Sequence, residues 1–430
     1  MAAILLTGAS GFIGRHLADA LVRDGHEVTC AVRDATRPQD SRFKYVSVDY
    51  TRDVDAADWL PRLSGIDVVI NAVGILREHR TQTFDAIHHK SPRALFAACV
   101  QAGVRRAVQI SALGADERAT SGYHLSKKRA DDYLASLPLS SVIVQPSLIY
   151  GSGGTSARLF SVLASLPLIM LPGQGHQRVQ PVYIDDLVDA IRLLVDRDFG
   201  TAVYLPVVGP EPMALRTFIA TLRAAMGGGP AHFFPVPLGF VRIAARAASL
   251  LPGALLDPET LSMLERGNTG DVGPLARLLG RLPRPVRQFI APGEAAALRL
   301  RAQLAWLLPM LRLGIALVWI LTGIVSLGLY PVAESYALLA RVGITGVLAP
   351  LMLYGAALLD LGFGLATLLL RRRRWLWMAQ LAVIGFYTVI ITFRLPEFWL
   401  HPYGPLSKNL PMLAAIFLLL ELEEEQSGRA

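Results

Sequence analysis

The chain has 430 residues, of which 53% are hydrophobic, and a formal net charge of +8. This length exceeds what one hydrophobic core normally organises, so we expect two domains. The sequence lacks a module that combines basic and aromatic residues, which argues against nucleic acid as a partner. Half of the charge comes from four consecutive arginines, Arg371 to Arg374, between two apolar stretches, and this arrangement indicates a lipid bilayer instead.

Short apolar runs alternate with longer helical patterns in the first half of the chain. The runs cover residues 3–7, 27–32, 45–48, 67–71, 107–111 and 141–145. This alternation predicts an α/β domain of the Rossmann type, in which helices cover both faces of a doubly wound parallel sheet. We expect this domain to span residues 1–292. Its Gly- and Pro-rich part, residues 151–292, is expected to form the substrate side.

A glycine-rich segment follows the first predicted strand and opens a helix. Such a turn lets the backbone approach a pyrophosphate, and the helix N-terminus offers unpaired N–H groups to it. The segment therefore predicts a dinucleotide-binding loop. Its expected cofactor-binding residues are Gly8, Ala9, Ser10, Gly11, Phe12, Ile13 and Gly14.

The end of the second strand decides which dinucleotide is expected. NAD-binding proteins usually place an acid there for the ribose 2′-hydroxyl, but this chain has Val32 followed by Arg33. An arginine can pair with a 2′-phosphate, so the sequence favours NADP(H) over NAD(H). In the alternative interpretation, Arg33 is a surface residue and Asp34 serves the ribose. Other strand ends add the expected cofactor contacts Asp49, Asn71, Ala72, Val73, Gly74, Pro146 and Ser147.

Three further groups of residues complete a recognisable set. Ser111 ends the fifth strand, and the run Tyr123-His124-Leu125-Ser126-Lys127 opens the next helix. Together with the glycine loop they resemble the short-chain dehydrogenase/reductase superfamily. The words ISALGAD at 110–116, QPSLIYG at 145–151 and QPVYIDD at 180–186 resemble its atypical extended branch. That branch is similar to the 39-kDa-type accessory subunit of respiratory complex I, and the resemblance covers residues 1–290.

The resemblance implies a catalytic set made of Tyr123, Lys127 and Ser111. A tyrosine with its ordinary pKa of about 10 exchanges protons poorly at neutral pH, so a nearby ammonium must lower that pKa. Lys127 lies four residues after Tyr123 and shares its helical face. By resemblance, Lys127 also holds the nicotinamide ribose, Ser111 hydrogen-bonds the substrate oxygen, and Tyr123 exchanges a proton with it.

The sequence departs from the superfamily pattern at two positions. His88 stands in place of the asparagine that helps position the lysine, and Gln145 stands where many extended members have arginine. Arg178 occupies a place where extended relatives contact an anionic substrate, and it is equally an ordinary surface arginine. We expect no metal site, because neither His88 nor His89 has a partner at metal-ligand spacing.

Three functions are compatible with these residues. The first is a membrane-anchored, NADPH-dependent oxidoreductase whose substrate is a hydrophobic or quinone-like small molecule. The second is a cofactor-binding module without turnover, inside a possible membrane protein complex. The third is a sugar-nucleotide epimerase or dehydratase, which a fused membrane domain disfavours because nucleotide sugars are water-soluble.

Four apolar segments follow the first domain, at residues 304–329, 347–370, 375–393 and 406–422. About 20 apolar residues cross a bilayer core, so we expect a four-helix transmembrane bundle. The loop from Pro396 to Asn409 resembles the DoxX-like family, over residues 304–422. The N-terminus shows no targeting signal, and the arginine cluster follows an even number of crossings. We therefore expect an integral protein of the inner or plasma membrane, with the Rossmann domain in the cytoplasm.

Two charges interrupt the apolar segments. Arg312 and Asp360 are expected at similar depths in the bilayer, where an ionisable residue usually has a partner. The sequence therefore predicts an ion pair between them. Two alternatives remain open: Arg312 reaches the cytosolic surface, or Asp360 is protonated and bonded to a neighbouring helix.

Overall fold

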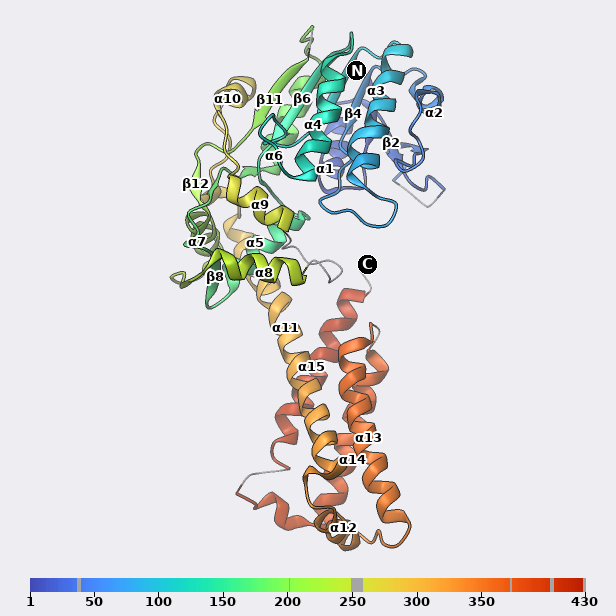
Figure 1. Cartoon of the computed structure of the whole chain (residues 1–430), viewed down its shortest axis with the longest axis vertical. Helices are drawn as coiled ribbons and strands as arrows, with labels where there is room; N and C mark the ends of the chain where they lie inside the picture. The colour runs from blue at the N-terminus through green and yellow to red at the C-terminus, as the bar shows by residue number, and fades with distance from the viewer. Residues whose placement is uncertain (37–39, 201, 249–257, 372, 403–405, 428–430) are drawn as a thin grey trace. The chain divides into compact units, whose positions relative to one another are not determined.

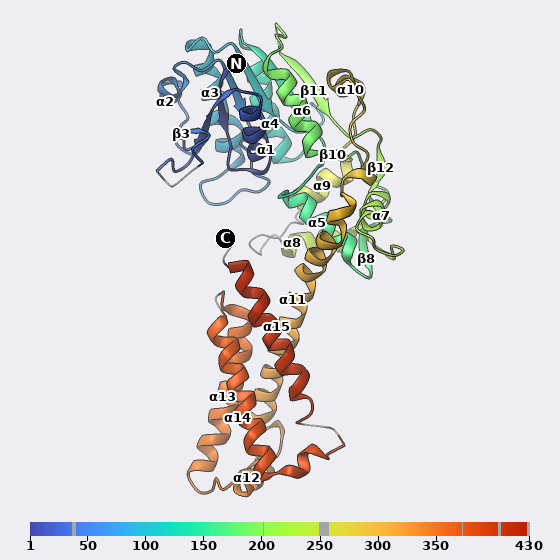
Figure 2. The ribbon, with the colours of Figure 1, turned by 180° about the vertical axis from the view of Figure 1, so that it is seen from behind.

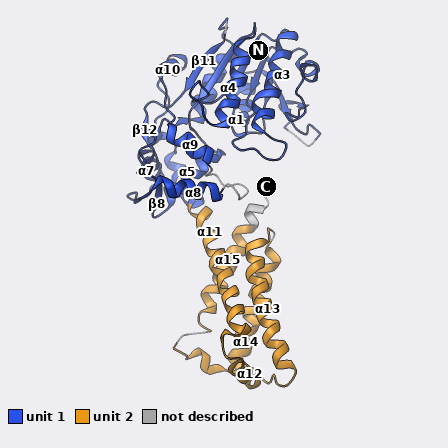
Figure 3. Cartoon of the chain, in the orientation of Figure 1, with its two compact units in different colours: residues 1–302 blue, residues 303–430 orange. Residues whose placement is uncertain are grey.

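The computed structural model describes residues 1–36, 40–200, 202–248, 258–371, 373–402 and 406–427. They divide into two compact units, Met1–Ala302 and Gln303–Ala430 (Figure 3). Unit 1 contains a seven-stranded sheet in the order β11-β6-β5-β4-β1-β2-β3, and all of its pairings are parallel (Figure 1). Its strands are β1 (Ala3–Thr7), β2 (Glu27–Val32), β3 (Lys44–Ser47), β4 (Val68–Asn71), β5 (Arg106–Ile110), β6 (Ser140–Pro146) and β11 (Val203–Val207).

Helices cover both faces of this sheet, so the predicted doubly wound fold is confirmed. Strand β1 shows how the sequence achieves this: Ile4 and Leu6 join one hydrophobic cluster, and Leu5 joins the cluster on the opposite face. Successive side chains of a strand point to opposite faces, so a strand buried on both sides reads as a continuous apolar run. One face is covered by α1 (Phe12–Arg23) and α6 (Ile184–Val195), and the other by α2 (Ala56–Trp59), α3 (Ser91–Gln101) and α4 (Gly122–Ala135).

The remainder of unit 1 forms a smaller region with its own hydrophobic cluster. This cluster gathers apolar side chains from α5, α7, β8 and the first turns of α11. The region contains three two-stranded sheets, β7 with β10, β9 with β12 and β8 with β13. Its elements are β7 (Ile149–Tyr150), α5 (Thr155–Ser165), β8 (Ile169–Pro172), β9 (Arg178–Val179), β10 (Val182–Tyr183), β12 (Met213–Ala214), α7 (Leu215–Ala225), β13 (Phe233–Val236), α8 (Leu238–Ala248), α9 (Pro258–Arg266) and α10 (Gly273–Leu279).

Unit 2 is helical. Its elements are the continuation of α11 (Pro292–Ile324), then α12 (Val332–Arg341), α13 (Leu348–Leu369), α14 (Arg374–Arg394) and α15 (Asn409–Ser427) (Figure 2). Three helical segments among the described residues are long and apolar enough to cross a membrane: Pro292–Leu329, Leu348–Leu369 and Arg374–Arg394. The first segment begins earlier than the sequence predicts. Helix α15 covers the expected fourth segment but is not one of the three.

Helices α11 and α13 pack closely through two glycines. A Cβ atom at Gly323 would lie 2.8 Å from the carbonyl oxygen of Ala357, and one at Gly364 would lie 2.9 Å from that of Ala316. Real Cβ atoms essentially never approach so closely, so larger residues at either position would force the helices apart. Small residues that allow close backbone approach are typical of helix contacts in lipid.

The predicted ion pair between Arg312 and Asp360 is wrong. Arg312 forms an ion pair with Glu423 of α15, and the indole N–H of Trp377 donates to the same carboxylate at 3.0 Å. Asp360 is buried, and its Oδ1 atom has no hydrogen-bond partner among the described residues. Glu423 lies just beyond the apolar segment 406–422, so the pattern of charges inside the apolar segments does not indicate it as a partner.

Candidate functional site

The glycine loop between β1 and α1 is closed by backbone contacts. Gly8 has a φ angle of +69°, and a Cβ atom there would lie 2.7 Å from the carbonyl oxygen of Ala72. The Gly11 N–H donates to the Gly8 carbonyl at 2.8 Å. A Cβ atom at Gly14 would lie 2.1 Å from that same oxygen. Gly8 and Gly14 are therefore required by the loop itself, which presents the N-terminus of α1 beside the ends of β1 and β4, as a pyrophosphate requires.

A buried polar network lies beneath this loop. Thr7 and Tyr50 both donate hydroxyl protons to Oδ1 of Asn71 at 2.7 Å, and its Nδ2 donates to Gln109 at 2.7 Å. Burial raises the pKa of Tyr50 above its usual range, so its hydroxyl stays protonated as a donor. The Asn71 side chain was expected to contact the cofactor. In the structure it instead hydrogen-bonds residues of the neighbouring strands β1 and β5. Ala72, Val73 and Gly74 continue from it as the segment at the tip of β4.

Two charged residues follow β2, the exposed Arg33 and the hydrogen-bonded Asp34. Arg33 is exposed and forms no hydrogen bond or ion pair within the part of the chain that the structure describes. Asp34, the alternative ribose ligand, accepts from the backbone N–H and hydroxyl of Thr36 at 3.1 and 2.6 Å. Asp49 accepts in the same way from Thr51, which lowers the pKa of its carboxyl. Both acids are held in local turns, whereas Arg33 is not.

Lys127 is the most constrained member of the predicted catalytic set. It is 3% exposed, and its Nζ atom donates to the carbonyl oxygens of Val73 at 3.2 Å and Ile110 at 2.9 Å. A Cβ atom at Gly74 would lie 3.2 Å from this nitrogen. Burial lowers the pKa of Lys127 to about 8, against the opposing effect of Asp131. The ammonium is therefore fixed beneath the segment that follows β4.

Ser111 lies at the end of β5, as predicted, but its hydroxyl has another partner. It donates to Oδ2 of Asp131, a fully buried carboxylate one turn after Lys127. Burial raises the pKa of Asp131 to about 7, although the hydrogen bond from Ser111 and the charge of Lys127 act in the opposite direction. A hydroxyl that donates to Asp131 cannot donate the same proton to a substrate. The Ser111 hydroxyl is thus not free to donate to a substrate oxygen, the role that the resemblance implies.

Tyr123 lies in the first turn of α4 within an aromatic group. Its ring centroid is 6.0 Å from that of Phe84 and 5.3 Å from those of His88 and His124. Burial, followed by the charge of Asp131, raises the pKa of Tyr123 to about 12. This direction is opposite to the one predicted from a nearby ammonium, because Lys127 directs its Nζ atom at backbone carbonyls. Tyr123 is therefore protonated at neutral pH.

His88 links two parts of the candidate site, whereas the sequence indicates it only as a departure from the superfamily pattern. It lies in a π-helical turn, Asp85–Lys90, before α3. Its Nε2 atom accepts from the Ile75 N–H at 3.0 Å, and its Nδ1 atom lies 3.0 Å from the hydroxyl of Ser126. Since Ser126 donates to the Tyr123 carbonyl at 2.8 Å, it accepts from His88, which fixes the Nδ1–H tautomer. The signal in the sequence was a polar residue, His88, at the position where the superfamily has asparagine. Such a residue can hydrogen-bond two neighbouring segments at once.

The remaining predicted residues lie on the substrate side of the sheet. Ser147, which follows Pro146 at the end of β6, is buried and donates to the Gln180 carbonyl at 2.6 Å. Arg178 in β9 is exposed and donates to the Pro212 carbonyl at 3.2 Å. The Ser147 hydroxyl therefore connects the end of β6 to the segment around Gln180. The Arg178 side chain stays near the surface.

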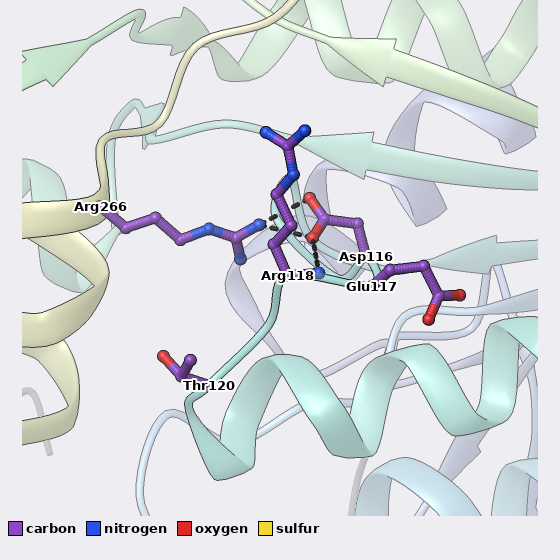
Figure 4. A pocket seen from close by; sticks show the side chains of 5 residues that line it. All are labelled: Asp116, Glu117, Arg118, Thr120 and Arg266. Atoms are coloured by element: carbon purple, nitrogen blue, oxygen red, sulfur yellow. Dashed lines mark hydrogen bonds and ion pairs between the residues drawn. The ribbon is translucent and has the colours of Figure 1, made fainter.

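A polar pocket of about 600 Å³ lies beside the loop that joins β5 to α4 (Figure 4). Helix α9 holds this loop at both of its ends. Arg266 donates to the Gly114 carbonyl at 2.6 Å and pairs with Asp116, while Glu259 accepts from the Tyr123 N–H at 3.3 Å. The pocket is lined by Asp116, Glu117, Arg118, Thr120 and Arg266. Sequence reasoning missed α9, because no local motif links it to Tyr123.

Comparison with known proteins agrees with this architecture. Residues 4–204 match the NAD dependent epimerase/dehydratase family, and residues 316–417 match the DoxX-like family. The chain thus joins an epimerase-like NAD-binding domain to a DoxX-like domain. This NAD-binding domain resembles ceramide reductase from Caulobacter vibrioides, with 32% identity over 188 residues, which are 43% of this chain and 57% of the relative.

A second relative belongs to respiratory complex I, as the sequence motifs predicted. It is the NADH dehydrogenase 1 alpha subcomplex subunit 9 of Arabidopsis thaliana, 29% identical over 43% of this chain and 48% of the relative. The chain spans about half the length of the curated relatives it matches. A nucleoside-diphosphate-sugar epimerase from Staphylococcus aureus has the same fold, with a TM-score of 0.55, 16% identity and coverage of 67% of this chain and 99% of that one.

Proposed function

We propose that the chain is a membrane-anchored, NADPH-dependent oxidoreductase that acts on a hydrophobic substrate. The observation that carries this proposal is the position of Lys127, whose buried ammonium is fixed under Gly74, four residues after Tyr123. Burying an ammonium costs free energy unless the group is hydrogen-bonded. Buried ionisable groups with a shifted pKa cluster at functional sites, so the position of Lys127 beside the glycine loop supports catalysis.

The cofactor would be held by the chain's own backbone and one arginine. The Gly8–Gly14 loop has the closed geometry that accepts a pyrophosphate, and Arg33 supplies a cation for a 2′-phosphate. Lys127 would hold the ribose hydroxyls next to the nicotinamide. When bound, the reduced nicotinamide supplies a hydride to the substrate's carbonyl carbon.

Tyr123 would act as the proton donor in this reduction. Its hydroxyl is protonated at neutral pH, so it can give its proton to the carbonyl oxygen as the hydride reaches the carbon, which leaves an alcohol and a tyrosinate. The tyrosinate then regains a proton from solvent. His88 and Phe84 hold the ring in place through edge contacts.

A hydrophobic substrate is supported by the second unit and by one relative. Three helices of sufficient length and apolarity fix the chain to a bilayer, where hydrophobic compounds concentrate, and a relative of the NAD-binding domain is a ceramide reductase. We propose that residues 1–292 face the cytoplasm of a cell bounded by an inner or plasma membrane. The ion pair of Arg373 with Glu423 at 3.9 Å supports this topology, because it places the arginine cluster after α13 and the end of α15 at one level.

One observation favours a second function, a cofactor-binding module without turnover. The Ser111 hydroxyl donates to Asp131, so it is not free to hydrogen-bond a substrate oxygen as the implied mechanism requires. The relatives that are complex I subunits are consistent with such a role. The decisive experiment follows nicotinamide absorbance of the purified chain with NADPH and extracted membrane lipids. Steady oxidation supports the reductase, whereas tight binding without oxidation supports the module.

A further inference from the structure

An exposed apolar surface lies at one end of unit 1, on the strands β8 and β13 and the helix α8. We call it the apolar surface; its side chains are 52% to 68% exposed. Figures 1 and 2 place β8 and α8 side by side, and a Cβ atom at Gly173 after β8 would lie 3.9 Å from Leu238 of α8. Its members are Leu168, Met170, Phe234, Phe240 and Ile243.

The strands of this surface alternate between core and solvent. Ile169 and Leu171 point into the hydrophobic cluster of the smaller region, while Met170 between them points outward. Met170 is the register partner of Phe234, so two large apolar side chains stand together on the outer face. A water-facing strand face is normally polar, which makes this pair a sign of an apolar partner.

Helix α8 has the same two-sided character. Val241 and Ala245 are buried against Leu261 of α9, whereas Phe240 and Ile243 project from the helix. The same short helix carries two cations, Arg242 and Arg246, and Arg242 also pairs with Glu265 of α9 at 3.1 Å. Apolar residues with flanking arginines on a helix of large amphipathicity are typical of helices that lie in a membrane surface.

The surroundings of the apolar surface carry further positive charge. Arg216 stacks over the ring of Phe233, the neighbour of Phe234, at 5.1 Å. Arg299 and Arg301 are exposed on α11, where Arg299 also donates to the Gly227 carbonyl at 2.7 Å. Anionic headgroups attract such cations at a cytoplasmic membrane surface. The charge therefore favours a lipid surface over a second apolar protein face as the partner.

Continuity with the chain's first membrane helix points to the same partner. The apolar segment Pro292–Leu329 begins inside unit 1, where Ala295 and Leu298 pack against the cluster that contains Ile169 and Leu171. The strands that present Met170 and Phe234 are thus built on the same cluster as the start of that segment. Within unit 1, the apolar surface and the first residues of that segment therefore share one hydrophobic cluster.

We propose that the apolar surface lies in the headgroup layer of the bilayer, with Phe240 and Ile243 inserted among the lipids. Helix α9 then connects this contact to the candidate site, since it packs on α8 through Leu261 and holds the Tyr123 segment through Glu259 and Arg266. The bilayer contact does not depend on whether Tyr123 is catalytic.

Fluorescence quenching in nanodiscs tests this contact on the full-length chain. Cys30 and Cys99 are buried, and burial raises the pKa of each thiol to about 12, so an introduced surface cysteine is labelled selectively. Single variants Phe240→Cys and Ile243→Cys receive an environment-sensitive dye in nanodiscs that contain anionic lipids with nitroxide groups near the headgroups. Leu282→Cys is the matched control, because Leu282 is 63% exposed and Ile243 is 64% exposed.

The proposal expects strong nitroxide quenching at positions 240 and 243 and little at 282. It also expects weaker quenching when anionic lipids are replaced by zwitterionic ones. Equal quenching at all three positions would overturn it, as would unquenched dyes at 240 and 243 that remain open to aqueous iodide. Dyes shielded from both quenchers would instead show that another part of this chain or a second copy covers the surface.

Discussion

The Nε2 atom of His88 accepts a hydrogen bond from the backbone N–H of Ile75 at 3.0 Å. Only a neutral histidine can accept in this way, and its other nitrogen must then carry the proton that reaches Ser126. Burial, with a contribution from the charge of Lys127, lowers the pKa of His88 to about 2. His88 is thus a neutral bridge between the segment after β4 and the helix that carries Tyr123.

This bridge predicts an acid sensitivity of unit 1. The unfolded chain protonates His88 near pH 6.5, whereas the folded chain resists protonation until about pH 2, so stability falls as pH drops below 6.5. One proton contributes a slope of up to about 1.4 kcal/mol per pH unit. We expect His88→Gln to remove this contribution between pH 7 and 5. Pulse proteolysis of the full-length chain in urea measures the free energy of unfolding of unit 1, when the cleavage products are followed by peptides that come from that unit. The control His232→Gln, at an exposed position, should keep the full slope.

Tyr123→Phe should lower the rate of NADPH oxidation by about 10²- to 10⁴-fold, the range for loss of a general acid. NADPH affinity should remain, because the phenyl ring keeps its contacts with Phe84 and His88. Lys127→Met should reduce both the rate and the affinity. Stopped-flow turnover and calorimetric titration separate the two effects. An active chain that keeps its full rate with phenylalanine at position 123 would exclude Tyr123 as the proton donor.

Arg33→Ala should weaken NADPH binding by about 10- to 100-fold and leave NADH binding nearly unchanged, since only the 2′-phosphate loses a charge-assisted partner. Titration of both dinucleotides on the same preparation measures this difference. Arg197→Ala, at an exposed arginine that follows helix α6, should change neither affinity. Equal losses for both dinucleotides would show that Arg33 serves the shared part of the cofactor.

The ion pair between Arg312 and Glu423 predicts non-additive energetics in unit 2. Arg312→Met or Glu423→Gln alone should destabilise the bundle more than the double variant, because a lone charge in an apolar setting is the costly species. Thermal unfolding in detergent of the three variants gives the coupling. Asp360→Asn combined with Arg312→Met should be additive. Coupling to Asp360 and not to Glu423 would contradict the observed pairing.

The sequence allowed the α/β fold to be predicted because its signals are local. Apolar runs define β1 to β6, and the close contacts of Gly8 and Gly14 explain why glycines are spaced as they are. The partners of Ser111 and Arg312 were not predictable in this way. Ser111 follows β5 and bonds Asp131 in α4, and Arg312 pairs with Glu423, which is more than a hundred residues away in the sequence. Such pairings depend on tertiary packing, for which one sequence holds no periodic signal.

The sequence predicted which residues lie in the candidate site better than it predicted how their side chains are arranged. Lys127 and Tyr123 lie on α4 as expected, but the direction of the Tyr123 pKa shift depends on where the Lys127 side chain points. The backbone carbonyls of Val73, in the segment after β4, and of Ile110, at the end of β5, decide that direction. The contribution of α9 through Glu259 and Arg266 likewise has no motif in the sequence.

The close approach of α11 and α13 at Gly323 and Gly364 also limits how a lipid-soluble compound can travel. With backbone atoms in contact at two levels, this seam leaves no width for an acyl or prenyl chain to slip between the two helices. If the proposed function holds, a hydrophobic substrate would therefore have to reach unit 1 by a path other than the seam between α11 and α13.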